Sequence, residues 1–408
     1  MSRKIYVYVG NWSFEAKPEK GKGVSIFSYE EETGDMTLLE TIRPDVAGGQ
    51  MYLDGERQIL YVSNECGERR GEIGGGGYVM AYRINPEDGS LSLMNEKESL
   101  CPEPSYLCMD QTKRYLIACH CSDPWHVTKI VKRKDGTYAN EVLFDDTALV
   151  MFRIQEDGSL GDVCDVAITE GTGGKDPRSQ VNVDPVSGHI QLVEVISRLH
   201  SVVKSPSGGV FAVCDKGMDR IYTYRIDYEK ECLMRLDEWV SEDVACFPRY
   251  GAFHPTLPVF YANNENHATL NCFHCDEEIG KLQCTKTIDL LSYDPGMVDG
   301  KPVGAQDILV HPSGKCMYVT LCGLNLIIVL HLDEEGNPTC AQEVKSGGVL
   351  PRGLGMSPDQ RFLLSGNMVS GDITTFAVAE DGTLTSTGKV IPAVSPSAIR
   401  FFVSEEPS

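Results

Sequence analysis

The most constraining feature of the sequence is a short turn pattern that recurs along almost its whole length. Each copy separates two short apolar runs. Four copies are clear: Ser205-Pro206-Ser207-Gly208, His254-Pro255-Thr256-Leu257, His311-Pro312-Ser313-Gly314 and Ser357-Pro358-Asp359-Gln360. Weaker copies stand at Asp54-Gly55 and Asp110-Gln111. A repeat of this kind indicates one supersecondary unit that is stacked many times.

The repeated unit is built from β-strands. Runs rich in Val, Ile, Tyr and Phe alternate with Gly, Asp and Asn, and helical periodicity is scarce. A second turn, as in Asp88-Gly89-Ser90-Leu91 and Asp157-Gly158-Ser159-Leu160, recurs after the edge-like strand of the unit and indicates one hairpin used repeatedly. Full units begin near residues 49, 104, 199, 248, 305 and 351.

The two ends of the chain complete one further unit. The N-terminus opens directly on residues 6–11 without an innermost strand, and residues 397–403 supply that strand. We therefore predict an all-β fold, a seven-bladed β-propeller of four-stranded blades, closed by a C-terminal strand that completes the N-terminal blade. Residues 1–408 form a single propeller domain in this prediction, with insertions at about 66–77, 122–146 and 171–197.

Charge and the N-terminal sequence limit the partners and the location. Lys and Arg number 37 against 59 Asp and Glu, a net charge of -22, so we predict neither nucleic acid nor a membrane as partner. The N-terminus reads as a strand and lacks the apolar segment of a signal peptide, so we expect a cytoplasmic protein. The fifteen cysteines, an odd number, are expected to be reduced thiols. The sequence carries no signal for the oligomeric state.

The repeat predicts which residues line the central channel. Five residues before each turn, on the innermost strand, stand Gly49, Ser105, His200, Arg249, Gln306, Arg352 and Ser397. The second strands end at Glu65, Cys121, Lys216, Glu265, Cys322 and Met368, each preceded by one of Asn64, His120, Asp215, Asn264, Leu321 and Asn367. Strand alternation places each preceding residue on the opposite side or in the exit loop. The count predicts a polar pocket at one mouth of the channel, walled mainly by blades 4 to 7.

Four segments carry a resemblance to a known family. They are Tyr8-Val9-Gly10-Asn11-Trp12, Leu199-His200-Ser201, Pro248-Arg249 with Phe253-His254-Pro255 and Asn264-Glu265, and Pro351-Arg352-Gly353-Leu354. Over essentially its full length the chain resembles the seven-bladed propeller lactonases, which include bacterial 6-phosphogluconolactonase and fungal carboxy-cis,cis-muconate cyclase. The resemblance implies a catalytic group of His200, Arg249 and Glu265. Cys322 stands where family members often have Arg, which makes a phosphorylated or polycarboxylate substrate less expected than a neutral or singly charged lactone.

These residue types suit the hydrolysis of a sugar-type lactone without a cofactor. His200 is the expected general base, and Arg249 and Arg352 can hold an oxyanion or a substrate carboxylate. Glu265 could orient the imidazole, hold sugar hydroxyls or exchange a proton with the leaving alkoxide. The expected partner is a small-molecule lactone or sugar acid, and the substrate-binding candidates are Arg352, Gln306, Asn264, Asn367, His120 and Glu65.

Other interpretations remain open at this stage. His200 could simply hydrogen-bond a neighbouring blade, and Arg249 and Arg352 could form structural ion pairs with Glu265 and Asp307. The same residues would also suit a cycloisomerase, which moves a proton to or from carbon. A non-catalytic interaction scaffold is the alternative from another class, because fold alone does not give function.

Two further groups of residues are expected to be structural. His254 and His311 occupy the repeated turn, where Ser or Asp stands in other copies, so we predict that they cap it. The cluster Cys119-His120-Cys121 lies in a strand, where alternation sends His120 to the face opposite the two cysteines. We therefore predict no metal site.

Overall fold

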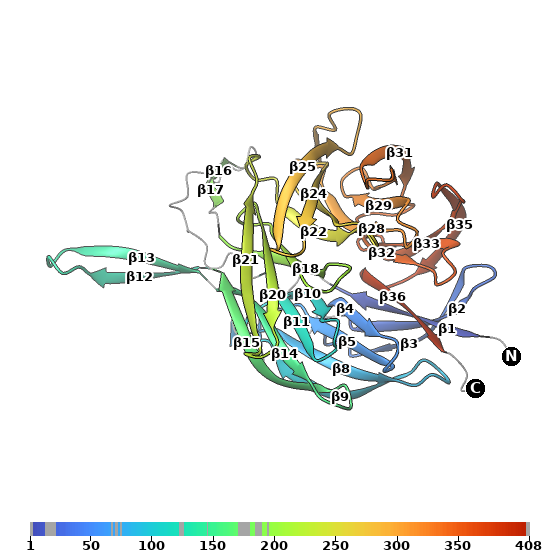
Figure 1. Cartoon of the computed structure of the whole chain (residues 1–408), viewed down its shortest axis with the longest axis horizontal. Helices are drawn as coiled ribbons and strands as arrows, with labels where there is room; N and C mark the ends of the chain where they lie inside the picture. Colours follow the sequence, from blue (N-terminus) through green and yellow to red (C-terminus); the bar gives the residue numbers. More distant parts are fainter. Residues whose placement is uncertain are drawn as a thin grey trace.

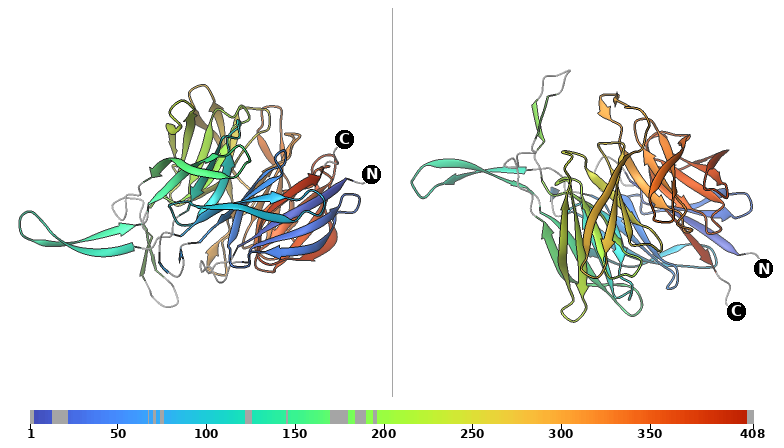
Figure 2. Two further views of the ribbon diagram at one scale, coloured as in Figure 1. Left: turned by 90° about the horizontal axis from the view of Figure 1, so that it is seen from below. Right: turned by 45° about the horizontal axis from the view of Figure 1, so that its top comes forward.

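The computed structural model describes residues 3–12, 22–66, 68–69, 72–73, 76–121, 126–144, 146–169, 180–183, 190–193 and 196–404. Seven four-stranded antiparallel sheets surround a central axis (Figures 1 and 2). This arrangement confirms the predicted all-β, seven-bladed propeller. The described residues contain no helix with the length and apolar character needed to cross a membrane.

Each blade runs from an innermost strand to an outermost strand. In that order the blades consist of β36 (Pro396–Ser404), β1 (Lys4–Asn11), β2 (Val24–Glu30) and β3 (Asp35–Ile42) in blade 1; β4 (Gly48–Asp54), β5 (Ile59–Asn64), β8 (Tyr78–Ile84) and β9 (Leu91–Glu98) in blade 2; β10 (Pro104–Met109), β11 (Tyr115–His120), β14 (Thr147–Ile154) and β15 (Leu160–Thr169) in blade 3; β18 (Leu199–Lys204), β19 (Phe211–Asp215), β20 (Arg220–Asp227) and β21 (Cys232–Val240) in blade 4; β22 (Pro248–Phe253), β23 (Val259–Asn264), β24 (Thr269–Asp276) and β25 (Lys281–Asp289) in blade 5; β28 (Ala305–Val310), β29 (Cys316–Leu321), β30 (Leu326–Leu332) and β31 (Pro338–Lys345) in blade 6; and β32 (Pro351–Met356), β33 (Phe362–Asn367), β34 (Asp372–Val378) and β35 (Leu384–Pro392) in blade 7.

The C-terminal strand closes the ring as predicted. β36 pairs antiparallel with β1, for example Val7 with Phe401, and outside blade 1 it packs on β4 of blade 2 and on β32 and β33 of blade 7. The hydroxyl of Ser397 donates to the carbonyl oxygens of Gly10 at 3.0 Å and Gly49 at 3.1 Å. Blade 1 is therefore held together by both ends of the chain, which lie side by side in Figure 1.

Buried tyrosines of the second strands tie four of the blades to the next blade. The hydroxyls of Tyr8 and Tyr61 donate to the carbonyls of Gly89 at 2.9 Å and Gly158 at 2.6 Å, in the outer hairpin turn of the following blade. Tyr261 and Tyr318 repeat this contact with Gly336 and Gly382. All four glycines have positive φ, from 73° to 87°, which a residue without Cβ adopts at little cost. The repeated hairpin turn thus also joins neighbouring blades.

Four short hairpins are inserted between the blade strands. Their strands are β6 (Glu68–Arg69) with β7 (Glu72–Ile73), β12 (His126–Lys132) with β13 (Tyr138–Phe144), β16 (Gln180–Val183) with β17 (Ile190–Val193), and β26 (Met297–Val298) with β27 (Lys301–Pro302). The first three lie inside the predicted insertions, and the fourth was not predicted. Each follows a second or a fourth strand, so all four leave the propeller at the mouth where the innermost strands begin.

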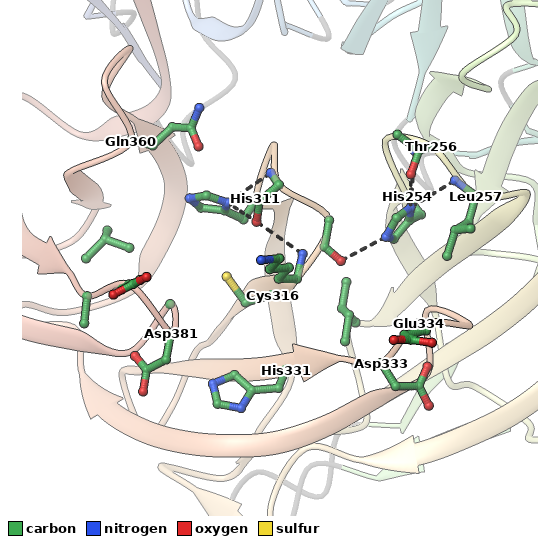
Figure 3. A pocket seen from close by; sticks show the side chains of 18 residues that line it. His254, Thr256, Leu257, His311, Cys316, His331, Asp333, Glu334, Gln360 and Asp381 are labelled. Atoms are coloured by element: carbon green, nitrogen blue, oxygen red, sulfur yellow. Dashed lines mark hydrogen bonds between the residues drawn. The ribbon is translucent and has the colours of Figure 1, made fainter.

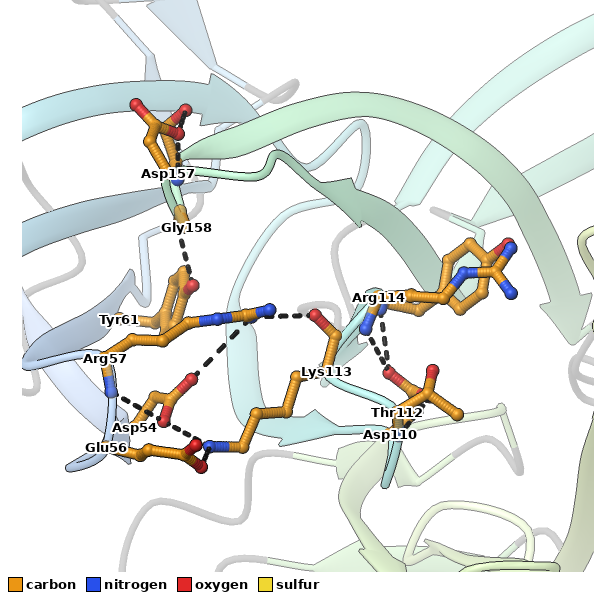
Figure 4. A network of polar contacts seen from close by, with 12 residues as sticks. Asp54, Glu56, Arg57, Tyr61, Asp110, Thr112, Lys113, Arg114, Asp157 and Gly158 are labelled. Carbon is orange, nitrogen blue, oxygen red and sulfur yellow. Dashed lines mark hydrogen bonds and ion pairs between the residues drawn. The ribbon is translucent and has the colours of Figure 1, made fainter.

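The opposite face is made of the tight turns between strands. In blades 2 and 3 a polar network joins these turns (Figure 4). The ammonium of Lys113 contacts Asp54 at 2.7 Å and Glu56 at 2.6 Å, and Arg57 Nη1 donates to the carbonyl of Lys113 at 2.9 Å. The groups of this network pair with one another, so the network joins two blades.

Candidate active site in the channel

A β-bulge occurs in every innermost strand at the position that the repeat count selected. In β18, Leu199 pairs with Asp215 and Ser201 with the adjacent Cys214, so His200 is an extra residue. The same register shift falls at Ser105, Arg352 and Ser397 and within residues 49–50, 249–250 and 306–307. A bulge re-aims the side chain at its position. Seven bulges at one level therefore build the ring of side chains around the axis.

Blades 4 and 5 form one side of the mouth, which we call the His200 side: His200, Lys216, Arg249 and Glu265. The Lys216 ammonium lies 2.8 Å from Glu265 Oε2, and Arg249 Nε lies 3.4 Å from the same oxygen without the alignment of a hydrogen bond. Arg249, 1% exposed, also donates from Nη1 to the Gln306 carbonyl at 2.6 Å. Glu265 thus holds two cations in place.

Tyr250 brings His200 and Arg249 together. Its ring meets the His200 imidazole edge to face at 5.3 Å, and Arg249 Cζ lies 4.3 Å from the centre of the same ring. Nδ1 of His200 is buried and has no hydrogen-bond partner among the described residues. The imidazole is therefore oriented by packing, and this nitrogen is not occupied by a protein donor.

The electrostatics of the His200 side fix the protonation of its members. Burial and the cations Arg249, Lys216 and Arg352 hold the pKa of His200 well below its ordinary value, so the imidazole is neutral. Burial alone would raise the pKa of Glu265, but Lys216 and Arg249 outweigh it and lower that pKa to about 2. Glu265 is therefore a permanent carboxylate near neutral pH.

Blades 1, 2 and 7 form the facing side, which we call the Trp12 side: Trp12, Glu65 and Arg352. The Arg352 guanidinium stacks over the Trp12 ring at 4.0 Å, and its Nη2 lies 3.7 Å from Glu65 Oε1. Gly49 leaves the space that Glu65 fills, since a Cβ at residue 49 would lie 1.9 Å from Glu65 Oε2. Burial raises the pKa of Glu65, although Arg352, Arg249 and Lys216 oppose the shift.

Below these two sides, an aromatic and polar layer fills the channel. Gln50 Nε2 of blade 2 donates to the Tyr250 hydroxyl of blade 5 at 2.9 Å, and Tyr106 packs edge to face on Tyr250 at 5.3 Å. Arg400 Nη2 donates to Gln50 Oε1 at 3.2 Å. These contacts across the axis give the site a floor.

Comparison with known proteins identifies the family of the chain. The model of a family described as "Lactonase, 7-bladed beta-propeller" matches residues 6–401. The chain belongs to this lactonase family. The 6-phosphogluconolactonase of Cronobacter sakazakii is 22% identical to it over 384 residues, which cover 94% of this chain and 96% of that protein.

Solved structures support the fold of this lactonase. The periplasmic gluconolactonase of Pseudomonas aeruginosa aligns with a TM-score of 0.77 and 21% identity, over 98% of this chain and 99% of that one. A candidate 6-phosphogluconolactonase from Bacteroides fragilis aligns with a TM-score of 0.75 and 20% identity, over 98% of each chain. The resemblance inferred from the sequence is thereby confirmed, including the assignment as an enzyme. The cytoplasmic location stays a prediction.

The lactonase structure does not bring every predicted site residue to the channel. Asn264 Nδ2 donates to Asn271 Oδ1 at 2.6 Å and to Thr269 Oγ1 at 2.8 Å, inside blade 5. Asn367 Nδ2 donates to Asp372 Oδ1 at 2.8 Å in blade 7. Nδ1 of His120 lies 3.0 Å from the carbonyl of Ala148, and burial lowers the pKa of His120 to about 4. These contacts favour a structural role for the three residues, whose substrate-binding role stays a prediction.

Gln306 and Cys322 lie together beside the His200 side. Gln306 Nε2 donates to Cys322 Sγ at 3.5 Å, and the Gln306 carbonyl accepts from Arg249 as described above. Burial raises the pKa of the Cys322 thiol, so this position is neutral. The cation that the family resemblance led us to expect at this position is therefore not replaced by another charge there.

The sequence analysis assigned no site role to three residues that the structure places in the channel mouth. Trp12 follows Asn11 as Glu65 follows Asn64, so the repeat count could have placed it on the second ring. Lys216 was counted on that ring, but its contact with Glu265 depends on side-chain direction. Tyr250 faces the channel only because of the bulge in β22. No residue pattern in the sequence predicts that bulge.

A separate cavity of about 800 Å³ lies on the opposite face of the lactonase, between turns of blades 5 to 7 (Figure 3). His254 Nδ1 accepts from the backbone N–H of Leu257 at 3.0 Å, and His311 Nδ1 accepts from that of Ser313 at 3.1 Å. These contacts confirm the predicted turn-capping role of both histidines. No residue named on the two sides of the mouth lines this cavity.

Proposed function

We propose that this lactonase hydrolyses a sugar-type lactone in the channel mouth, with His200 as general base and no cofactor. One observation carries the proposal: a neutral imidazole, that of His200, shares the Tyr250 ring with the guanidinium of Arg249. A neutral imidazole can take a proton from water. The names of the relatives, 6-phosphogluconolactonase and gluconolactonase, support a sugar lactone as the substrate class.

The cations supply the other requirement of the reaction. Attack of water on the carbonyl carbon places negative charge on the carbonyl oxygen, and preorganised donors at that position lower the barrier. Arg249 and Arg352 lie on the two sides of the mouth, and both are held by aromatic rings, at 4.3 Å and 4.0 Å. We assign oxyanion stabilisation to Arg249, the neighbour of His200 on Tyr250, and substrate binding to Arg352 and Gln306.

Glu265 has a supporting role in this proposal. Its pKa of about 2 removes it from proton exchange near neutral pH. Its carboxylate instead fixes Lys216 and Arg249, both of which contact Oε2. The contacts of Glu265 thus argue against proton transfer, one of the three roles expected from the sequence, and support a fourth role, which is to orient Lys216 and Arg249.

The charge of the site bears on the substrate. Lys216 and Arg249 are paired with Glu265, Arg352 lies near Glu65, and Cys322 is neutral. Cys322 supplies no further cation that could bind a dianionic group. We therefore propose a neutral or singly charged lactone as the preferred substrate.

A panel of plain and phosphorylated sugar lactones in a pH-stat assay tests both statements. We expect turnover of the plain lactones with a higher kcat/KM than of the phosphorylated ones. Absence of turnover across the panel would remove the proposed function. A preference for phosphorylated lactones would leave hydrolysis in place and reject the charge argument. Formation of a lactone from an unsaturated dicarboxylic acid would instead identify a cycloisomerase.

A further inference from the structure

Two glutamates occupy equivalent repeat positions in the channel mouth, one on each side. Glu65 follows β5 of blade 2, and Glu265 follows β23 of blade 5. Each backbone N–H donates to a carbonyl in the loop before its own blade, that of Ala47 at 2.9 Å and that of Phe247 at 2.8 Å. We propose that Glu65 donates the proton to the ring oxygen that leaves when the lactone opens. This inference rests on the lactone hydrolysis proposed above.

The contacts of Glu65 leave its carboxyl group unoccupied. Glu65 is 6% exposed, and neither carboxyl oxygen has a hydrogen bond from the described residues. Arg352 Nη2 lies 3.7 Å from Oε1, beyond hydrogen-bond distance. The carboxyl lies over Gly49, the only glycine among the seven ring positions. A residue that merely balanced charge would be expected to form a close ion pair, as Glu265 does at 2.8 Å.

Glu265 cannot take the same role. Its Oε2 is contacted by Lys216 and Arg249, and the resulting pKa of about 2 means that it carries no proton to give. The two glutamates therefore have different roles on the two sides of the mouth. Glu265 holds cations, and Glu65 remains available for proton transfer.

The surroundings of Glu65 favour its protonated form. The charged and titratable groups that face it are Arg352 of β32, Arg249 and Tyr250 of β22, Lys216 after β19 and Cys121 after β11. Burial outweighs the three cations and raises the pKa of Glu65, while burial and the same cations lower the pKa of His200. Burial thereby shifts both groups toward their neutral forms, which are the forms that a base and an acid need in hydrolysis.

The proton balance of the step is complete with these two residues. His200 takes a proton from water as the hydroxide oxygen bonds to the carbonyl carbon, and an oxyanion forms beside Arg249. Collapse of this intermediate breaks the bond between the carbonyl carbon and the ring oxygen, and Glu65 gives its proton to that oxygen. The product acid ionises, His200 releases its proton to solvent, and Glu65 takes one up. The net change is lactone plus water to hydroxy-carboxylate plus one proton.

The variants Glu65→Gln and Glu265→Gln form a matched test, with two lactones that differ in leaving group. An aliphatic sugar lactone expels an alkoxide, whereas dihydrocoumarin expels a phenoxide, which leaves without protonation. We expect Glu65→Gln to lower kcat on the sugar lactone by about 10²-fold and to leave dihydrocoumarin nearly unchanged. Glu265→Gln should affect both lactones alike. Equal loss on both lactones in Glu65→Gln would overturn the proposal while leaving lactone hydrolysis standing.

A second measurement does not depend on turnover. Infrared difference spectra of wild type minus Glu65→Gln at neutral pH should show the carbonyl stretch of a protonated carboxyl group. If that band is absent, Glu65 is ionised and the proposal fails, whatever the enzyme hydrolyses. Glu65→Asp retains a carboxyl group and should recover part of the leaving-group dependence, which a purely structural loss would not allow. Should wild type hydrolyse neither lactone, the proposed function and this role of Glu65 both fall.

Discussion

The His200 side and the Trp12 side of the channel mouth use the same residue types in opposite ways. On the His200 side, one glutamate is held by Lys216 at 2.8 Å and Arg249 at 3.4 Å, and it stays ionised. On the Trp12 side, Glu65 lies 3.7 Å from Arg352, and burial raises its pKa. Equivalent positions in a repeat therefore acquire different chemistry through the number and distance of their neighbours.

The largest expected effect comes from removing the base on the His200 side. His200→Asn keeps the polarity but takes away the proton acceptor, so kcat on a sugar lactone should fall about 10²–10⁴-fold. A pH-stat assay measures the loss. His311→Asn is the matched control, because that imidazole only caps a turn on the opposite face. Equal losses in both variants would contradict the assignment of His200.

A smaller loss should follow from crowding the Trp12 side. A Cβ at Gly49 would lie 1.9 Å from Glu65 Oε2, so Gly49→Ala must displace the proposed proton donor. We expect kcat on the sugar lactone to fall by about 10-fold to 10²-fold, with the leaving-group dependence of Glu65→Gln. Gly55→Ala is the control, since no atom lies within 4 Å of a Cβ there. Unchanged kinetics in Gly49→Ala would show that the position of Glu65 is unimportant.

Repeat counting predicted the architecture and one level of residues around the axis because each blade has the same irregularity. The count selected His200, Arg249 and Arg352 as residues of one ring, and the structure places the register shift of each innermost strand at these positions. Strand alternation alone would have turned alternate residues away from the axis. Alternation did apply to Asn264 and Asn367 on the second strands, whose amides donate within their blades.

The state of each charged group could not be predicted from the sequence. Glu65 and Glu265 each follow an Asn at the end of a strand, and only the packed structure shows which carboxylate meets Lys216. The contact of Tyr250 with both His200 and Arg249 likewise depends on backbone register. Interactions between blades of this kind are set by packing across the axis, which a linear repeat does not record.

The pH dependence of thermal stability should separate the two sides by sign. The pKa of Glu265 is lowered from 4.5 to about 2, so its stabilising contribution is present above pH 4.5 and is lost as pH falls toward 2. The pKa of Glu65 is raised above 4.5, so its contribution is present below 4.5 and is lost as pH rises through the folded-state value. Scanning calorimetry of the two Gln variants should show changes of a few degrees at opposite ends of the pH range. Changes at the same end would refute the contrast.

The smallest expected effects are equal losses of stability in blade 2, which carries part of the Trp12 side, and blade 5, which carries part of the His200 side. Tyr61 of blade 2 and Tyr261 of blade 5 each donate to the outer turn of the next blade. Tyr61→Phe and Tyr261→Phe should each lower the free energy of unfolding by about 1 kcal/mol, because a buried carbonyl loses its partner. Tyr138→Phe is the control, since that ring is 68% exposed on the β12–β13 hairpin. A clear inequality between the two buried variants would indicate that the sides differ in architecture as well as in chemistry.

The seven bulges also separate what the scaffold needs from what the chemistry needs. Ser105 and Ser397 stand at ring positions but use only their hydroxyls, for backbone carbonyls of neighbouring strands. The backbone irregularity that aims a side chain at the axis is present there too. The bulge therefore belongs to the propeller scaffold, and the chemistry of each ring position depends on which side chain stands there.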